Sequence, residues 1–197
     1  MKHQLSNKNI GLVLAAIFLF CSCTQQKIRE NMQLMQSRAV MLETDNMICL
    51  FNDTTKLKYD KPLKLVVYND SSVCKPCLMA HISEWTGIRN TPACKDVDFY
   101  FIFSAKEADI EAYRKGYVTN EVRLPVFLDT ANVFQKSNPH IPKEWIYHTF
   151  LLDENDKIIF VGNPLRDTKM EKLFYKVLNQ KGDNSVPISQ VKRQKDI

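Results

Sequence analysis

Two cysteines separated by two residues offer the clearest chemistry in this sequence. They form the motif Cys74-Lys75-Pro76-Cys77. In an exported protein such a pair can be a structural disulfide, half of a zinc site, or a dithiol that exchanges disulfides with other proteins. A zinc site needs further ligands, but Cys49 and Cys94 stand alone in the sequence and no H-x-x-x-H motif accompanies them. We therefore expect no metal, and dithiol chemistry requires no cofactor.

The sequence around the motif favours the redox use. Residues 63–68 are apolar and β-branched, as expected of a buried central strand, and residues 69–73 break the pattern. A helix is then expected from Cys74 or Cys77 to Ile88. The first cysteine would follow a buried strand, and the second would lie at the start of a helix.

A helix start is a favourable place for a reactive thiol. Its unpaired backbone N–H groups and the helix macrodipole stabilise negative charge, which lowers the pKa of a cysteine from about 8.5. Lys75 adds positive potential, and Pro76 suits the first helical turn because its missing N–H is not needed there. We expect Cys74 to attack a client disulfide and Cys77, one turn further in, to resolve the mixed disulfide.

The elements that must position this motif follow in a β-α-β-α order, closed by a hairpin and a helix. Two parallel strands joined by a crossover helix and one antiparallel hairpin give a mixed sheet with helices on both faces, an α/β fold that resembles thioredoxin. The expected strands are 47–51, 63–68, 97–103, 124–128, 149–153 and 157–161, and the expected helices after the motif are 106–115, 130–136 and 166–178.

The N-terminus resembles the signal peptide of a bacterial lipoprotein. Basic residues precede an apolar run over residues 10–20, which is too short to cross a bilayer of about 30 Å. Leu19-Phe20-Cys21-Ser22-Cys23 resembles a lipobox, and Cys23 is the expected lipidation site because the small Ser22 precedes it. We expect a signal peptide over 1–22, a lipid anchor with a helical spacer over 23–46, a thioredoxin-like domain over 47–180, and a polar C-terminal tail over 181–197.

Charge and location restrict the expected partners. Removing Lys2 and Lys8 with the signal peptide lowers the formal net charge from +5 to +3. Part of that surplus lies in residues 192–195, which we interpret as a solvated tail, so no nucleic-acid partner is expected. A lipid-anchored protein facing the periplasm or the exterior would meet an oxidising environment, where paired cysteines can stay oxidised.

The stretch from Leu63 to about Leu178 resembles thioredoxin-like proteins of the membrane-tethered TlpA type. The matching pieces are the strand before the motif, Leu124-Pro125-Val126-Phe127-Leu128-Asp129, and Thr149-Phe150-Leu151-Leu152-Asp153 with its hairpin partner. The resemblance implies an envelope thiol-disulfide oxidoreductase that acts on client thiols or disulfides and is reset by a redox partner.

Two departures from the family concern residues near the expected site. The family has a cis-proline just before the strand that begins at Thr149, but Tyr147 or a neighbour stands there in this sequence. Because a cis bond at a non-proline residue costs about 3–4 kcal/mol, we expect a trans peptide. The acidic residue that thioredoxin carries near the end of the first core strand is replaced by Tyr68.

The remaining candidates have two readings each. His148 could stabilise a thiolate or bind metal, or it could be a surface or merely hydrogen-bonded histidine. Trp85, Trp145 and Tyr147 are expected in the core, with an apolar rim for a protein partner as the alternative. His81 is interpreted as helix surface or a packing contact. Cys49 and Cys94 could form a disulfide or remain two unrelated buried thiols.

Three functions compete on this sequence. The first is an envelope enzyme that exchanges disulfides through Cys74 and Cys77. The second is a thioredoxin-fold lipoprotein that acts as a binding module without redox turnover, which the missing proline favours. The third is copper handling through the two cysteines and His148.

Overall fold

The computed structural model describes residues 25–51, 58–70, 75–121 and 124–181, with the backbone alone for residues 75–78 and 181. The predicted signal peptide, the expected lipidation site Cys23, the expected nucleophile Cys74 and residues 182–197 of the predicted tail lie outside the described residues.

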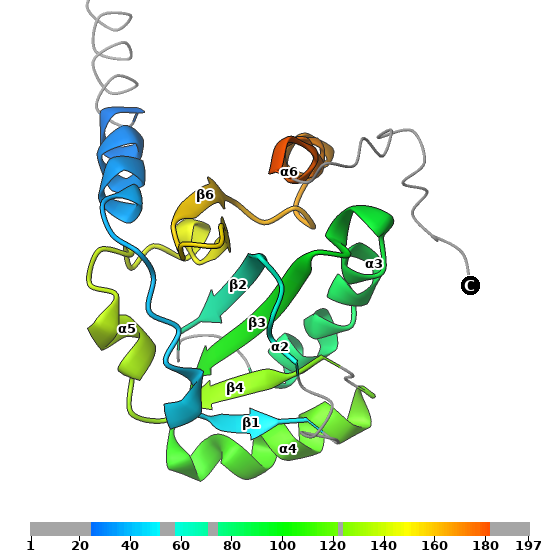
Figure 1. The fold of residues 1–197 in the computed structure, drawn as a ribbon. Helices are drawn as coiled ribbons and strands as arrows, with labels where there is room; N and C mark the ends of the chain where they lie inside the picture. Colours follow the sequence, from blue (N-terminus) through cyan, green and yellow to red (C-terminus); the bar gives the residue numbers. More distant parts are fainter. Residues whose placement is uncertain (1–24, 52–57, 71–74, 122–123, 182–197) are drawn as a thin grey trace, which may run out of the picture.

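The described residues contain one six-stranded mixed sheet in the order β1-β4-β3-β2-β5-β6 (Figure 1). Strands β2, β3 and β4 are parallel to one another, while β5 pairs antiparallel with β2, β6 with β5, and β1 with β4. The predicted mixed sheet is therefore confirmed. The strands are β1 (Ile48–Leu50), β2 (Leu63–Asn69), β3 (Val97–Ser104), β4 (Val126–Asp129), β5 (Thr149–Leu152) and β6 (Ile158–Val161).

The helices follow the predicted order with shifted ends. They are a helix over residues 25–36, here called the N-terminal helix, then α2 (Lys75–Ile82), α3 (Trp85–Arg89), α4 (Ile110–Thr119), α5 (Val133–Ser137) and α6 (Thr168–Lys181). Short 3-10 turns are η1 (Thr44–Asn46), η3 (Pro92–Cys94), η4 (Glu107–Asp109) and η5 (Trp145–Tyr147).

The single helix predicted after the motif is instead two helices. The Ser83 hydroxyl donates to the Ala80 carbonyl at 2.7 Å, and the Glu84 N–H bonds to the His81 carbonyl. A serine that bonds nearby backbone in this way competes with the regular helical pattern. The break separates α2 from α3 and lets Trp85 turn into the core.

Alternating side chains of the sheet build two hydrophobic cores, one on each face. Leu65 and Val67 of β2 belong to the core covered by α2, α3, α4 and α6. Val66 and Tyr68, which point the other way, belong to the core covered by α5 and the N-terminal segment. This period of two is what a strand buried on both faces requires. Helices therefore lie on both faces of the sheet, as predicted.

The N-terminal segment is attached to the domain by specific bonds. Met35 and Val40 are buried in the second core. The Val40 N–H donates to the Asp156 carbonyl at 2.8 Å. The buried Asn138 side chain accepts from the Met41 N–H and donates to the Met41 carbonyl, both at 2.8 Å. One amide thus satisfies both backbone groups of Met41, as a neighbouring strand would.

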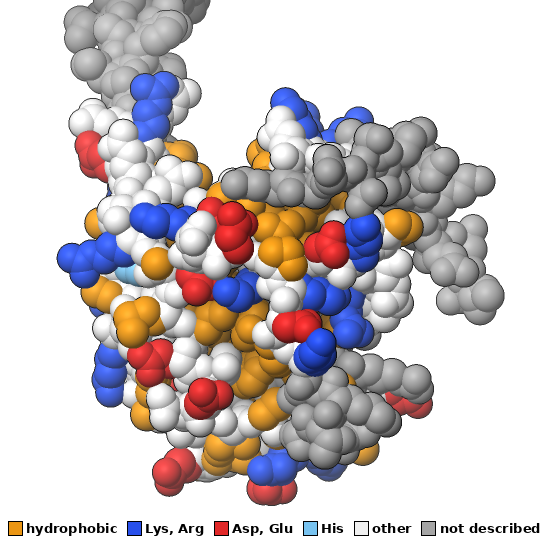
Figure 2. All heavy atoms as spheres, in the orientation of Figure 1, with side chains coloured by type: hydrophobic (Ala, Val, Ile, Leu, Met, Phe, Trp, Pro, Cys, Tyr) orange, Lys and Arg blue, Asp and Glu red, His pale blue; other side chains and the backbone are white. Residues whose placement is uncertain are grey.

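The surface carries charges of both signs. Figure 2 shows Lys and Arg side chains interspersed with Asp and Glu over the described part of one face. Within the described ranges, no helix combines the length and the apolar character needed to span a bilayer.

Candidate active-site pocket

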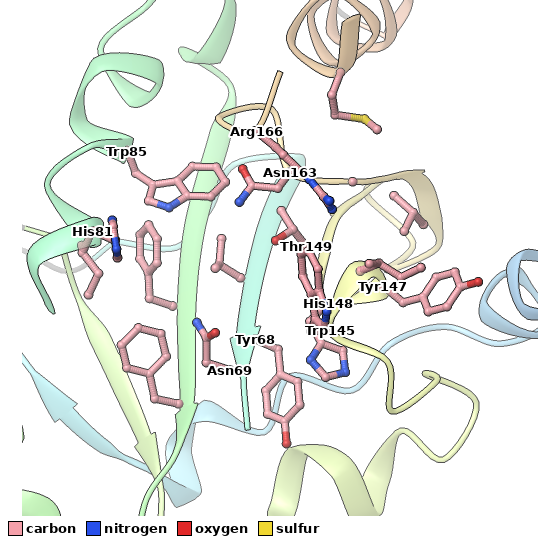
Figure 3. Close-up of a pocket in the computed structure, with 18 of the residues that line it drawn as sticks. Tyr68, Asn69, His81, Trp85, Trp145, Tyr147, His148, Thr149, Asn163 and Arg166 are labelled. Atoms are coloured by element: carbon pink, nitrogen blue, oxygen red, sulfur yellow. The ribbon is translucent and has the colours of Figure 1, made fainter. Parts of the chain in front are cut away.

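A pocket of about 500 Å³ lies beside the C-terminal end of β2. Its walls come from β2, α2, α3, η5, the residues that follow β6, and the N-terminal helix (Figure 3). None of the described lining residues is Asp or Glu. The volume lies within the range of about 300–1,000 Å³ that is usual for small-ligand sites.

In the sequence, the predicted motif comes shortly before two residues that line this pocket. The described part of α2 starts at Lys75, the residue after Cys74 in the sequence, and Cys77 is the third described residue of that helix. Further along the same helix, His81 and Ile82 line the pocket. The backbone therefore has the strand-then-helix arrangement that the sequence predicted for the motif, at one wall of the pocket.

The floor of the pocket is aromatic and apolar. Trp85 of α3 is buried and meets Phe101 of β3 edge to face, with 5.9 Å between ring centroids. The predicted core position of Trp85 is confirmed.

The rim of the pocket exposes large hydrophobic side chains. Ile28 is 44% exposed, Trp145 63% and Ile146 42%. The expectation that Trp145 belongs to the core is wrong. Its indole ring instead stacks under the Arg166 guanidinium, 4.7 Å from the ring centroid, and this cation–π contact holds it at the surface.

Tyr147 and part of the backbone around η5 make internal contacts. Tyr147 is buried in the second core, as predicted, and its ring points toward the N-terminal helix (Figure 3). The Tyr147 N–H bonds to the Glu144 carbonyl and the His148 N–H to the Trp145 carbonyl, while the His148 carbonyl accepts from the Tyr68 N–H. No cis peptide bond occurs in the described residues, so the trans peptide predicted before Thr149 is confirmed.

His148 is a buried histidine held by the backbone. Its Nε2 lies 3.0 Å from the Pro142 carbonyl oxygen, which only accepts, so Nε2 carries the proton. Burial lowers the pKa of His148 from its ordinary value. The ring is therefore neutral near pH 7 and supplies no positive charge to a thiolate. Of its two readings, the structure favours the hydrogen-bonded histidine.

Tyr68 does not replace the missing acid of thioredoxin. Its side chain points to the face opposite α2, where its ring centroid is 4.9 Å from those of Phe134 and His148. Burial raises the pKa of Tyr68 to about 12, so the phenol stays protonated near neutral pH.

Cys49 and Cys94 are free thiols, so a disulfide between them is not formed. Cys94 lies in the first core and Cys49 packs against the second, on opposite faces of the sheet. Burial raises the pKa of both thiols, that of Cys94 to about 11. In the described part of the chain, no three His, Cys, Asp or Glu side chains are grouped closely enough to bind a metal.

Sequence reasoning missed Arg166 and Asn163, among other residues of the pocket. Arg166 and Asn163 follow β6, and they reach the pocket only because the β5–β6 hairpin returns the chain beside η5 (Figure 3). Gly162 makes this return possible, since its φ of +139° suits glycine and a Cβ there would overlap the Met170 thioether. Their spacing in the sequence gives no signal of this proximity.

The strand arrangement identifies the fold. A βαβ unit supplies the parallel pair β2–β3, and β5 and β6 extend the sheet as an antiparallel hairpin on the other side of β2. The fold is thioredoxin-like. The thioredoxin-like fold predicted from the element order is thus confirmed.

Comparisons with solved structures report similarity to proteins of this fold. A thioredoxin-like protein solved in its oxidised form has 16% sequence identity and a TM-score of 0.49 over 75% of this chain and 98% of its own. A thioredoxin-like protein from Porphyromonas gingivalis has 19% identity and a TM-score of 0.45 over 68% and 86%. The thioredoxin domain of a thiol-disulfide oxidoreductase from Bacteroides vulgatus has 18% identity and a TM-score of 0.43 over 60% and 81%. No protein-family model and no curated protein sequence matches the chain.

Proposed function

We propose that this protein is a thiol-disulfide oxidoreductase that exchanges disulfides with client proteins through Cys74 and Cys77. One observation carries the proposal. The described part of α2 starts at Lys75 and holds Cys77 in its first turn, it follows strand β2 of a thioredoxin-like sheet, and a pocket lies beside it. A helix start favours a thiolate, and the pocket gives a client access to that end of the sheet.

The proposed exchange has two steps. The Cys74 thiolate attacks one sulfur of a client disulfide, which forms a mixed disulfide and releases the other client sulfur as a thiolate that takes up a proton. The Cys77 thiolate then attacks the Cys74 sulfur and releases the second client thiol. Two electrons pass from the dithiol to the client, and a Cys74–Cys77 disulfide remains. An external dithiol protein would reduce it again, and the reverse sequence would oxidise a client.

The proposed location is the cell envelope. The apolar run and the lipobox-like residues before Cys23 support export and lipid attachment, with the domain facing the periplasm or the exterior. Palmitate labelling of cells that produce the chain tests this, with Cys23→Ser as the variant expected to lose the label.

The activity is tested by insulin reduction and by trapping. The parent chain should reduce insulin with dithiothreitol as the electron source, and Cys74→Ser should abolish turnover. Cys77→Ser should accumulate mixed disulfides with clients because it cannot resolve them. Cys94→Ser is the matched control, since that thiol is buried in the core. Absence of turnover and of trapped clients would refute the oxidoreductase.

A binding module without turnover is the second candidate. It is favoured by η5, where the Tyr147 N–H and the Trp145 carbonyl are already bonded within the chain and the family has a cis-proline loop. This candidate requires Cys74→Ser to bind clients as tightly as the parent chain and to restore the phenotype of a deletion strain.

A further inference from the structure

We propose that the pocket selects clients by side chains: a large apolar residue next to Asp or Glu, with Arg166 as the residue that sets the charge preference. This inference rests on the proposed function and specifies its client class. It follows from three features of the described residues: the backbone of η5, the apolar rim, and the charge above the rim.

Part of the backbone around η5 is not free to pair with the main chain of a client. A client that adds as a strand needs free N–H and C=O groups on its partner. The N–H groups of Tyr147 and His148 and the carbonyl of His148 are bonded to Glu144, Trp145 and Tyr68. Main-chain pairing at these positions would require these internal bonds to break first.

The rim of the pocket instead offers apolar area. Ile28, Trp145 and Ile146 come from two segments far apart in sequence, yet all three line one pocket and all are more than 40% exposed. Burying such surface against a client side chain contributes about 25 cal/mol per Å². A phenylalanine or a large aliphatic residue suits this pocket.

Arg166 is the only Lys or Arg among the described residues that line the pocket. Arg166 is exposed, it is held on the Trp145 ring at 4.7 Å, and no ion pair joins it to another residue that the structure describes. Glu144, at the start of η5, already pairs with Lys27 at 3.0 Å. A guanidinium fixed on an aromatic ring keeps its donor edge available for a carboxylate. An acidic residue beside the apolar anchor would complete the contact.

Peptide binding tests this proposal. The ligands are blocked ten-residue peptides of Gly and Ser without cysteine that carry central Phe-Glu, Phe-Lys or Ala-Glu, measured by calorimetry on the full chain. We expect Phe-Glu to bind roughly tenfold more tightly than either other peptide. Arg166→Glu should reverse the preference between Phe-Glu and Phe-Lys, and Arg166→Gln should abolish it. Arg114→Glu is the matched control, because Arg114 is an exposed arginine of α4 outside the pocket.

A fourth peptide separates side-chain from main-chain recognition. Phe-Glu with N-methyl groups on the backbone beside Phe should keep its affinity within about twofold, since few main-chain bonds are lost. A tenfold loss on methylation, equal affinity for Phe-Glu and Phe-Lys, or an unchanged preference in Arg166→Glu would overturn the proposal. Circular dichroism and the thermal midpoint verify that each variant is folded.

Insulin reduction in the same preparation separates this inference from the proposed function. Turnover without a peptide preference refutes the side-chain selection alone. A peptide preference without turnover refutes the oxidoreductase and leaves a binding module with the same selectivity.

Discussion

Acid should destabilise this fold through two buried histidines. His140 and His148 are each 5% exposed, and burial lowers the pKa of both below the ordinary value of 6.5. His140 has no hydrogen-bond partner at either ring nitrogen among the described residues. In the unfolded chain both rings titrate near their ordinary value. Between pH 6.5 and the lowered pKa values of the folded state, the unfolded state therefore binds more protons than the folded state.

The sign and size of the effect follow from this difference. Stability rises with pH wherever the unfolded state binds more protons, so the free energy of unfolding should fall as pH drops below about 6.5. Each histidine can contribute up to about 1.4 kcal/mol per pH unit, and the two together up to about 2.8 kcal/mol per pH unit. The loss should end once the pH passes below the lowered pKa values.

Urea unfolding at pH 7.5, 6.5 and 5.5 measures this slope. His140→Gln and His148→Gln should each remove part of this pH dependence, and the double variant should remove most of it. The comparison is of slopes, so the stability of each variant at pH 7.5 does not matter. The reasoning is refuted if the double variant loses stability between pH 7.5 and 5.5 as steeply as the parent chain.

Three further perturbations test the framework around the pocket. Asn138→Ala should cost about 2–4 kcal/mol, measured by urea unfolding, because it leaves both backbone groups of Met41 without their bonds; an unchanged midpoint would contradict this. Gly162→Ala should lower the thermal midpoint by several degrees, since its φ of +139° and the Met170 thioether exclude a Cβ; a midpoint equal to that of the parent chain would count against this packing. Cys94, whose pKa burial raises to about 11, should resist iodoacetamide in the native chain and react in urea; native labelling at the unfolded rate would show that it is accessible.

The fold could be predicted because its strands carry a clear pattern. β2 and β3 carry continuous apolar runs over residues 65–68 and 99–103 and are separated by a helical stretch, which favours a parallel pair joined by a crossover. The hairpin around Asp156 could be predicted equally well. The break between α2 and α3 could not be predicted, because it depends on one serine hydroxyl turning back to the Ala80 carbonyl.

The pocket could be predicted only in part. Tyr147 and Trp85 were assigned correctly to the core because large aromatics usually lie there. The same rule failed for Trp145, whose exposed ring contacts Arg166, 21 residues later in the chain. The contribution of Ile28 was hidden as well, since a polar helix that reads as a spacer gives no sign that it forms a wall of the pocket.

The account depends most on the reactivity of Cys74. The direct measurement is the rate of Cys74 alkylation by iodoacetamide from pH 4 to 10 in the reduced full chain, mapped by mass spectrometry. A helix start beside Lys75 predicts a rate that rises with a midpoint below about 7.5. A midpoint at or above about 8.5, the value for a free cysteine, would contradict the proposed thiolate and with it the proposed function.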